Sequence, residues 1–448
     1  MTDAPRSSPA GAAAVSPWMA DPVALAQPLA GDLEVDVAIV GAGYTGLSTA
    51  LALRAEGMRV AVLEAEHAGF GASGRNAGHL TPTIGKDPPT LLRLFGRERC
   101  RALIALVETA IAHVERTIAT HAIDCAYEPV GNVLAAVHPM QYAMIDRAAR
   151  VGAEIGADGE LLEPAEMRRR GLPPRFLRGY FERRGGILHP GRYVRGLRAA
   201  ALAAGALLFE RTPIGTIEEG PVVTLVTPGG RVRARHVVLA TNAFTPALGR
   251  LRGTIVPVTV YLFRTAPLTA AARAALDWRG REGIYTAHEM LESYRLTDDQ
   301  RIVGGAKTVR YRFGSRIDTR PDPAVFTALE EAFHDRFPEL GDVEITDRWG
   351  GPIAIGLDFL PHLGRTGRYR NLLYSVGYAG HGVALASYAG VLVADLLLER
   401  EGAGTVLTAR RFLPLPPEPF RWLTVRALTA FFAAVDRRRD RAVRAAAG

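Results

Sequence analysis

The chain has 448 residues, of which 48% are hydrophobic and 22% charged, and this composition excludes a disordered, collagen-like or coiled-coil protein. At about 150 residues per domain, the length predicts two or three domains. Much of the formal net charge of +8 lies beyond residue 409, where nine arginines face three acidic residues. The rest of the chain is therefore too nearly neutral to bind nucleic acid.

The N-terminal residues 1–31 are rich in Ala, Ser and Pro and predict a loose leader without a secretory signal. The longest apolar stretch, Val383 to Leu398, is interrupted by an aspartate and is too short to cross a bilayer. Two cysteines, Cys100 and Cys125, cannot build a disulfide framework, which indicates a reducing compartment. We therefore expect a soluble protein of the cytoplasm.

A strand, a glycine-rich turn, a helix and a second strand follow the leader. Val35 to Val40 is a β-branched run typical of a buried strand, and GAGYTG at 41–46 follows it directly. Leu47 to Glu56 predicts a helix, and Arg59 to Leu63 predicts a strand that ends at Glu64. This order makes a βαβ unit and implies a parallel sheet.

The turn of this unit has the features of a dinucleotide site. Gly41 allows a sharp turn, Gly43 leaves room for a pyrophosphate, and Gly46 lets the helix pack closely on the strand. Glu64 stands where a carboxylate accepts hydrogen bonds from a ribose and repels the 2′-phosphate of NADP. A purely structural glycine turn is the alternative interpretation.

The remaining elements alternate between helix and strand along the chain. Helices are predicted at 89–122, 141–155, 193–204, 326–337 and 383–398, and strands at 130–137, 206–210, 222–226, 235–241, 255–263, 293–296, 301–304 and 371–376. Similar β-α elements stand near the start and near the end of the chain. We therefore expect the domains to interleave along the sequence.

The C-terminal region predicts a stiff arm followed by an amphipathic helix. Its prolines are Pro414, Pro416, Pro417 and Pro419. Apolar residues then recur at helical spacing, namely Trp422, Val425, Leu428, Phe431, Phe432 and Val435, with Arg421, Arg426 and Arg437 to Arg439 beside them. We expect this helix to contact its own body or a partner subunit, and contact with an anionic membrane surface is the alternative.

Five motifs together resemble the FAD-dependent D-amino-acid-oxidase-like superfamily, and most closely its gamma-glutamylputrescine oxidoreductase branch. They are GAGYTG (41–46), EAEHAGFGASGRNAGH (64–79), HVVLATNAF (236–244), RWGGPIAIGLDFLPHLGR (348–365) and YSVGYAGHGVALA (374–386). The resemblance extends over most of the chain.

The resemblance implies an α/β fold, in which a Rossmann-like FAD-binding domain interleaves with a smaller α+β substrate domain built on a mixed or antiparallel sheet. It places 32–90, 160–254 and 345–405 in the FAD-binding domain and 91–159 and 255–344 in the substrate domain. Residues 406–448 form the Pro-rich arm and the basic helix.

The resemblance also assigns contacts to FAD. These are Gly41, Gly43, Tyr44, Thr45 and Gly46 at the ADP pyrophosphate; Glu64 and Ala65 at the adenosine ribose; Ala72, Ser73, Gly74, Arg75 and Asn76 along the pyrophosphate and ribityl chain; Pro213 and Ile214 at the adenine; Thr241 and Asn242 at a strand end; and Gly377, Gly380, His381, Gly382 and Val383 at the flavin. A helix N-terminus at the last group would stabilise the negative charge of reduced flavin. Relatives that bind flavin covalently use a cysteine or a histidine where this chain has Gly351 and Arg75, so we expect noncovalent FAD.

Candidate catalytic and substrate residues are fewer and rest on residue type. His381 and Lys307 are candidates for electrostatic or acid–base roles near the flavin, while His79 follows the flavin loop. Tyr261, Tyr294, Arg295 and Trp349 are candidates for the substrate face, because aromatic side chains enclose amines and arginine binds carboxylates. No Cys or His cluster has the spacing of a metal site, and we predict none.

The expected reaction is FAD-dependent oxidation of the C–N bond of an amine or amino acid, with hydride transfer to flavin N5, hydrolysis of the imine, and reoxidation by O2 to give H2O2. Hydride loss from a neutral amine needs no strong base. Three alternatives stay open. They are a quinone-linked amine dehydrogenase at the membrane surface, a flavoenzyme of the same fold that oxidises the C–O bond of a hydroxy acid or glycerol phosphate, and a flavin-binding protein without turnover.

Overall fold

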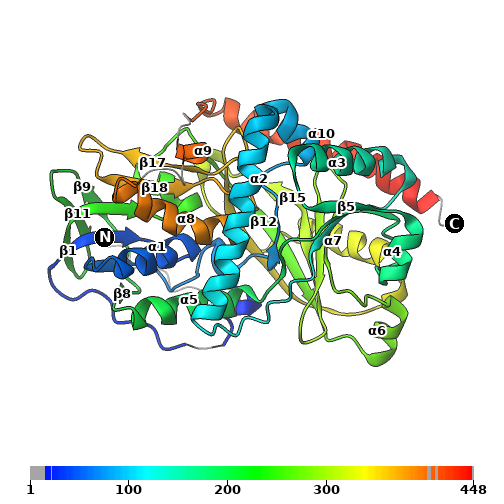
Figure 1. Cartoon of the computed structure of the whole chain (residues 1–448), viewed down its shortest axis with the longest axis horizontal. Coiled ribbons are helices and arrows are strands. Elements are labelled where there is room, and N and C mark those ends of the chain that lie inside the picture. The colour runs from blue at the N-terminus through cyan, green and yellow to red at the C-terminus, as the bar shows by residue number, and fades with distance from the viewer. Residues whose placement is uncertain (1–15, 22, 401–404, 409–411, 446–448) are drawn as a thin grey trace, which may run out of the picture.

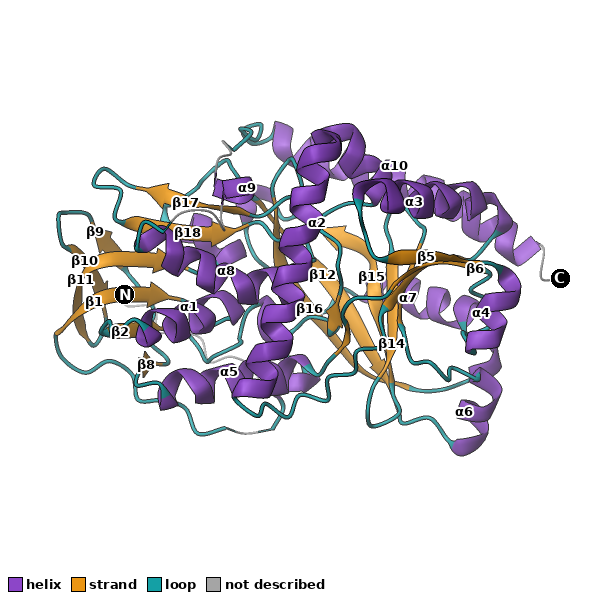
Figure 2. Cartoon of the chain, viewed as in Figure 1, coloured by secondary structure: helices purple, strands orange, loops and turns teal. Residues whose placement is uncertain are grey.

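The computed structural model describes residues 16–21, 23–400, 405–408 and 412–445. Most strands belong to two eight-stranded sheets that lie side by side (Figure 2), and β3 (His79–Leu80) and β7 (Gly186–Ile187) form a small third sheet. This arrangement confirms the predicted α/β fold with a Rossmann-like part and a second part built on a mixed sheet.

The first sheet has the order β17-β18-β11-β1-β2-β8, with β10 beside β11 and β9 beside β10. Its strands are β1 (Leu33–Val40), β2 (Val60–Leu63), β8 (Leu207–Phe209), β9 (Thr216–Glu218), β10 (Val223–Thr227), β11 (Gly230–Leu239), β17 (His362–Thr366) and β18 (Leu372–Val376). The five strands β18, β11, β1, β2 and β8 pair in parallel. Because parallel strands point their carboxyl ends to one edge, the turns after β1, β2, β11 and β18 meet there.

Helices cover the first sheet and bury its apolar residues. They are α1 (Tyr44–Ala55), α5 (Pro190–Ala203) and α8 (Gly382–Leu397). The α1 and α8 helices are in close contact, because Gly390 of α8 has no side chain to separate it from Ser48 and Thr49 of α1. Helices that lie more than 300 residues apart in the sequence therefore share one core.

The second sheet has the order β16-β12-β15-β14-β13-β4-β6-β5. Its strands are β4 (Asn132–Ala136), β5 (Gly159–Leu162), β6 (Arg178–Glu182), β12 (Val256–Thr265), β13 (Gly283–Thr286), β14 (Glu292–Leu296), β15 (Ile302–Arg310) and β16 (Ile345–Ile355). Only the β13–β4 pair is parallel. Helix α7 (Pro323–Arg336) buries Phe326, Leu329 and Phe333 in the core that this sheet shares with it.

The remaining helices complete the molecule. They are α2 (Pro88–Thr120), α3 (Tyr142–Ile155), α4 (Pro164–Arg170), α6 (Ala270–Leu276), α9 (Thr405–Thr408) and α10 (Phe420–Ala445), with short 3-10 turns η1 (Pro17–Met19), η2 (Ala72–Gly74), η3 (Pro139–Gln141), η4 (Asn242–Leu248), η5 (Phe313–Ser315) and η6 (Pro338–Leu340). In Figure 1 the long α2 helix crosses between the two halves. It bends at Gly96, whose φ of 73° is outside the helical range.

Three segments differ from the sequence-based expectations. Strands β5, β6 and β16, which we expected in the FAD-binding part, pair in the second sheet. Residues 16–21 and 23–31, which we expected to be loose, contact the body, since Trp18 is buried and the Leu29 N–H donates to Thr212. Short local patterns do not reveal such contacts with distant parts of the chain. Residues 1–15 of the predicted leader lie outside the described residues.

Both cysteines are buried free thiols. Within the described ranges, no helix combines the length and the apolar character needed to cross a membrane.

Candidate active site

The turn after β1 leaves no room for side chains at its glycines. Gly41 has a φ of +103°, and its N–H donates to the Leu63 carbonyl at 2.8 Å. A Cβ on Gly46 would stand 1.9 Å from the Gly41 carbonyl oxygen, and a Cβ on Gly43 would stand 2.9 Å from Ser73 Oγ. The turn therefore brings the N-terminus of α1 close to the loop that follows β2, which is the geometry of an anion site.

Glu64 lies at the end of β2 and faces the same turn. Its two carboxylate oxygens accept backbone N–H groups, from Ala42 at 2.8 Å and from Glu66 at 3.1 Å. Burial raises the pKa of this carboxyl, while the Ala42 N–H opposes the shift. Each oxygen keeps a second lone pair, so a ribose hydroxyl has acceptors at this position.

The loop at residues 69–79 is held by side chains from distant segments. Ser73 Oγ accepts the Tyr44 N–H at 2.9 Å, which ties the loop to the start of α1. The indole N–H of Trp18 donates to the Asn76 carbonyl at 3.0 Å, and that of Trp349 donates to the Arg75 carbonyl at 2.9 Å. These contacts keep the backbone of the loop in place beside the turn.

A cavity of about 400 Å³ runs along the turn and the loop. Most of the predicted FAD contacts line it: Gly41, Gly43, Tyr44, Thr45, Glu64, Ala65, Ala72, Ser73, Asn76, Pro213, Ile214, Thr241, Asn242, Gly380, Gly382 and Val383. The predicted contacts Gly46, Gly74 and Gly377 do not line this cavity. Arg75 and His381 line a second cavity instead. We call the first cavity the FAD cavity.

The two glycine-bearing turns at opposite ends of the chain converge on the FAD cavity. The Gly377 N–H donates to Asn242 Oδ1 at 3.0 Å, so the turn after β18 is fastened to the turn after β11. Sequence reasoning missed the apolar walls, which include Phe70, Phe244, Leu248, Pro352 and Ile353. An elongated cavity with an anion site, a ribose acceptor and a helix N-terminus fits a flavin dinucleotide.

A second cavity of about 280 Å³ adjoins the FAD cavity. The two share the lining residues Ala72, Asn76, Ile353, Ala379, Gly380 and Val383. The rest of its wall includes His79, Thr81, Thr83, Val260, Leu262, Tyr285, Glu289, Met290, Leu291, Ser293, Lys307, Thr308, Val309 and His381. It lies between the loop, the turn after β18 and one face of the second sheet, and we call it the substrate cavity.

The predicted substrate residues divide between this cavity and the interior. Lys307 and His381 line the substrate cavity, whereas Tyr261, Tyr294, Arg295 and Trp349 are buried and line neither cavity. Tyr261 packs edge-on against Phe326 of α7, on the other face of the sheet.

The physical reason is the alternation of side chains along a strand. Val260 and Leu262, on either side of Tyr261, face the cavity, and so does Ser293 beside Tyr294. For Tyr261 and Tyr294, sequence reasoning therefore chose the correct strands but the opposite face. Arg295 and Trp349 lie on the same face as Ser293 and Leu262, but they pack against Trp18 and not along the cavity.

His79 lines the substrate cavity and has one ring nitrogen without a partner among the described residues. Asn132 Nδ2 donates to the Leu80 carbonyl at 3.0 Å, so the other amide atom, Oδ1, faces His79 Nδ1 at 3.1 Å. Oδ1 therefore accepts a hydrogen bond from the Nδ1–H group. Nε2 is then an acceptor, and it is buried without a partner among the described residues. Burial lowers the pKa of His79 to about 4, so the imidazole is neutral near pH 7. The sequence singled out His79 after the flavin loop but not its partner, because Asn132 lies on another strand.

His381 has the same protonated nitrogen but a different partner. Its Nδ1 donates to the Ala379 carbonyl at 3.1 Å, across the turn that precedes α8. Burial lowers the pKa of His381 as well. The side chain therefore braces the turn and lines the substrate cavity as a neutral imidazole.

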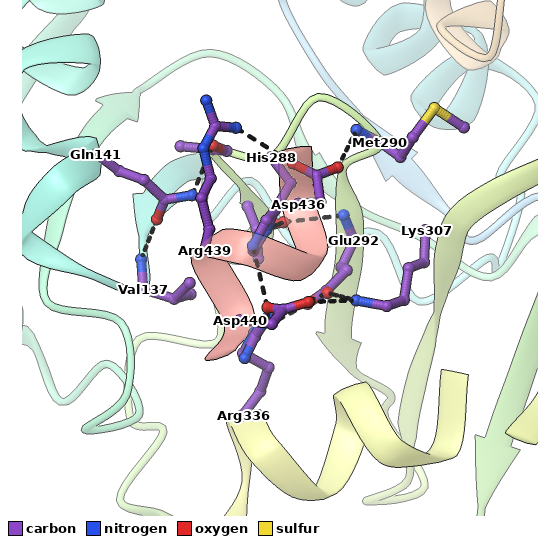
Figure 3. A network of polar contacts seen from close by, with 12 residues as sticks. Val137, Gln141, His288, Met290, Glu292, Lys307, Arg336, Asp436, Arg439 and Asp440 are labelled. Atoms are coloured by element: carbon purple, nitrogen blue, oxygen red, sulfur yellow. Dashed lines mark hydrogen bonds and ion pairs between the residues drawn. The ribbon is translucent and has the colours of Figure 1, made fainter. Parts of the chain in front are cut away.

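Lys307 stands on a β-bulge of β15. Between Val260 and Leu262 of β12 the register shifts, and Ala306 and Lys307 have φ angles of 74° and 49°. A bulge next to a cavity directs side chains that a regular strand would not. Lys307 Nζ donates to Glu292 at 2.7 Å and to Asp440 at 3.1 Å (Figure 3). Burial lowers its pKa, but these two carboxylates raise it more, so it stays an ammonium.

Helix α10 supports this wall of the substrate cavity. Asp436 accepts the N–H groups of Glu289 and Met290 at 3.0 and 2.9 Å, and Asp440 accepts from Arg336 at 2.6 Å (Figure 3). His288, Glu292 and Asp440 are the only group of possible metal ligands found among the described residues. Lys307 and Arg336 already neutralise those carboxylates, so the donor set does not favour a divalent ion.

The two positions at which relatives link flavin covalently are neighbours here. A Cβ on Gly351 would stand 3.1 Å from Cβ of Arg75. The Arg75 guanidinium donates to the carbonyls of Phe70 and Gly350. Glycine and arginine offer no nucleophile for a flavin bond, so the residues present fit FAD held by contacts alone.

Comparison with known proteins agrees with this site. A family model described as FAD dependent oxidoreductase (DAO) matches residues 36–396. The chain is 31% identical to gamma-glutamylputrescine oxidoreductase of Escherichia coli (strain K12), over 91% of this chain and 93% of that one. It is 28% identical to glycine oxidase of Geobacillus kaustophilus (strain HTA426), over 82% and 94%.

Among solved structures, the crystal structure of glycine oxidase from Geobacillus kaustophilus superposes with a TM-score of 0.73 at 23% identity, covering 85% of this chain and 100% of that one. The family match spans both sheets and both cavities. The chain therefore belongs to the DAO family of FAD-dependent oxidoreductases, and its cofactor is FAD.

Proposed function

We propose that the enzyme oxidises the C–N bond of a primary or secondary amine, or of an amino acid, bound in the substrate cavity. The observation that carries this proposal is the neutral imidazole of His79, a residue that lines the cavity and whose buried Nε2 has no partner among the described residues. An amine nitrogen is a donor, so it has a partner there. The names of two relatives, gamma-glutamylputrescine oxidoreductase and glycine oxidase, support the same substrate class.

The protein groups around the cavity orient the amine. The imidazole accepts its N–H, and the apolar side chains of Val260, Leu262 and Ile353 exclude water from the carbon that is oxidised. His79 and His381 stay neutral at pH 7, so neither adds a positive charge that would repel a cationic substrate on entry. FAD, when bound, supplies the redox chemistry by accepting the hydride.

We propose O2 as the oxidant that regenerates FAD, giving H2O2. Support comes from the oxidase among the relatives. A relative named D-amino acid dehydrogenase, 27% identical, favours the alternative, in which a quinone is the acceptor.

Anaerobic mixing of the purified holoenzyme with a panel of amines, polyamines and N-methyl amino acids tests the C–N proposal. Loss of the flavin absorbance with amines, and not with their hydroxyl analogues, is the expected result. If only hydroxy acids bleach the flavin, C–O oxidation replaces the proposal, and if nothing does, the protein is a flavin carrier.

The acceptor is tested by readmitting air to the reduced enzyme. Rapid recovery of the flavin absorbance with stoichiometric H2O2 is expected. A reduced enzyme that stays bleached in air and recovers only with an added quinone would assign it as a dehydrogenase.

A further inference from the structure

Helix α10 turns both of its described acidic residues toward the body of the protein. Asp436 holds the backbone of residues 289 and 290, and Asp440 pairs with Lys307 and Arg336. Nearer its start, Trp422 and Val425 pack on a cluster built around Val256 and Val258 of β12. The inward face of α10 therefore contacts the body at both ends of the helix, and Figure 1 shows the helix along the outer edge of the molecule.

The outward face of α10 is apolar and uncovered. Phe420, Leu423, Leu428 and Phe431 are 62%, 52%, 49% and 62% exposed. At 100° per residue they lie on one stripe of the helix, together with Ala427 and Ala434. Exposed apolar residues scattered singly need no explanation, but four large ones on a single stripe do.

The same stripe continues into cations. Arg438 and Arg441 follow it along the helix and are exposed. Within residues 420–441, which have described side chains, the two aspartates both point inward, so the outward face carries positive charge only. A helix with large apolar side chains on one face and arginines beside them is typical of binding at a lipid–water interface.

The neighbouring segment extends this surface. Phe313 is 51% exposed, and its ring lies 6.5 Å from that of Trp422. A groove of about 1250 Å³ separates this segment from α10. Its charged lining consists of Arg310, Arg312, Arg316, Arg320, Arg426 and Arg437 against Asp318 and Asp322. The excess of arginine makes the whole region attractive to anions.

We propose that the outward face of α10, with the segment around Phe313, docks the enzyme on an anionic lipid bilayer. The apolar side chains would enter the boundary between headgroups and acyl chains, while the arginines contact lipid phosphates and carboxylates. A second copy of the chain is a poorer occupant, because a twofold contact would pair this cationic face with itself, whereas an anionic surface has the opposite charge. The docking does not depend on which reaction the enzyme performs.

Co-sedimentation of the full-length holoenzyme with vesicles tests the proposal. Binding is expected to vesicles of phosphatidylcholine and phosphatidylserine in equal parts, and to weaken strongly with added salt. Binding to phosphatidylcholine alone should be much weaker. Leu423→Gln and Phe431→Gln should each lower the partition coefficient roughly tenfold, and Arg438→Gln and Arg441→Gln about fivefold each.

Matched variants elsewhere on the surface serve as controls. Leu94→Gln and Met140→Gln change side chains that are 51% and 62% exposed on other elements, and Arg93→Gln removes an exposed charge from α2. They should leave the partition coefficient unchanged. Vesicle binding is measured without any substrate being oxidised. Its outcome is therefore independent of the result with the amine panel.

Three results would overturn the proposal. One is the absence of binding to the phosphatidylserine vesicles at low salt. Another is binding that Leu423→Gln and Phe431→Gln do not weaken relative to the controls. The third is a concentration-dependent dimer in solution that Phe431→Gln abolishes, which would make a second copy the occupant of this face.

Discussion

At the scale of single residues, the amine contact that we propose depends on the pair of His79 and Asn132. Asn132 cannot reverse its amide without losing the Leu80 carbonyl, so it holds the imidazole proton on Nδ1. This tautomer leaves Nε2 as the acceptor that we assign to the amine. Such positioning by a second residue is how enzymes orient an otherwise ordinary imidazole.

Replacing His79 tests this role. In His79→Leu we expect kcat/KM for the amine to fall roughly ten- to hundredfold, because a hydrogen bond to a buried polar group is lost. His79→Gln keeps an acceptor and should recover part of the loss. Stopped-flow measurement of flavin reduction gives both values.

The control for His79 is His113→Leu. Burial lowers the pKa of His113 to about 4 as well, but the residue lies on α2 and lines neither cavity. It should leave kcat/KM unchanged. An equal loss in both variants would mean that buried histidines act on stability alone.

The pH dependence follows from the lowered pKa of His79. With a pKa of about 4, the imidazole is neutral from pH 5 upward and cannot produce a limb in the kcat/KM profile between pH 5 and 8. His79→Gln should therefore lower the profile without changing its shape in this range. A limb near pH 6.5 that disappears in the variant would contradict the assignment.

Gly46 is the residue on which the FAD turn depends. In Gly46→Ala, the new methyl carbon would overlap the Gly41 carbonyl oxygen, since a separation of 1.9 Å is far below contact distance. We expect FAD affinity to fall at least tenfold, measured by flavin fluorescence during dialysis. Gly215→Ala is the control, because its nearest neighbour is 3.5 Å away, and normal FAD affinity in Gly46→Ala would contradict the close packing of α1 on β1.

At the scale of elements, neighbouring residues of strands β12 and β14 have different surroundings, because successive side chains point to opposite faces of the sheet. One face of each strand lines the substrate cavity and the other packs on α7 or its neighbours. The bulge of β15 interrupts this alternation, and Lys307 on the bulge contacts Asp440 of α10. Helix α10 in turn fixes the loop that carries Glu289 and Met290, so a helix beyond the family match at 36–396 shapes the cavity.

Asp440→Asn tests the coupling between α10 and the cavity. The substitution leaves Lys307 and Arg336 with one carboxylate between them, and breaking such a buried pair costs on the order of 3 kcal/mol. We expect a lower urea midpoint and a raised KM for the amine, with FAD content unchanged. Arg438→Gln, on the opposite face, should stay within about 0.5 kcal/mol of the parent, and an unchanged KM in Asp440→Asn would contradict the coupling.

At the scale of the whole molecule, the cavity that we assign to FAD lies between the two halves. The FAD cavity is lined by turns of the first sheet and by Pro352 and Ile353 of β16 in the second. A ligand that binds only the folded state stabilises it in proportion to the logarithm of its concentration, by about 2.7 kcal/mol at 100 times its Kd.

Removal of FAD should therefore lower the free energy of unfolding, and added FAD should restore it. Urea titrations of apoenzyme at rising FAD concentrations measure this shift, which should follow the logarithm of the free concentration. The Gly46→Ala variant should need more FAD for the same shift. A midpoint that does not move with FAD would contradict preferential binding of FAD to the folded state.

The sequence by itself determined the parts that depend on neighbours along the chain. The strand, the GAGYTG turn, the helix and Glu64 lie within about thirty residues, so local geometry fixes them together, and the same holds for the turn at 377–382 before α8. Family motifs then predicted the two-part fold, the residues of the FAD cavity and the cofactor.

Only the tertiary structure decided the substrate cavity and the placement of α10. Whether Tyr261 or Val260 faces the cavity depends on which side of the sheet α7 covers, and the acceptor of His79 depends on Asn132, on another strand. Lys307 meets Asp440 across more than a hundred residues of chain. Side chains separated in this way are brought together by the packing of whole elements, for which a short stretch of sequence carries no signal.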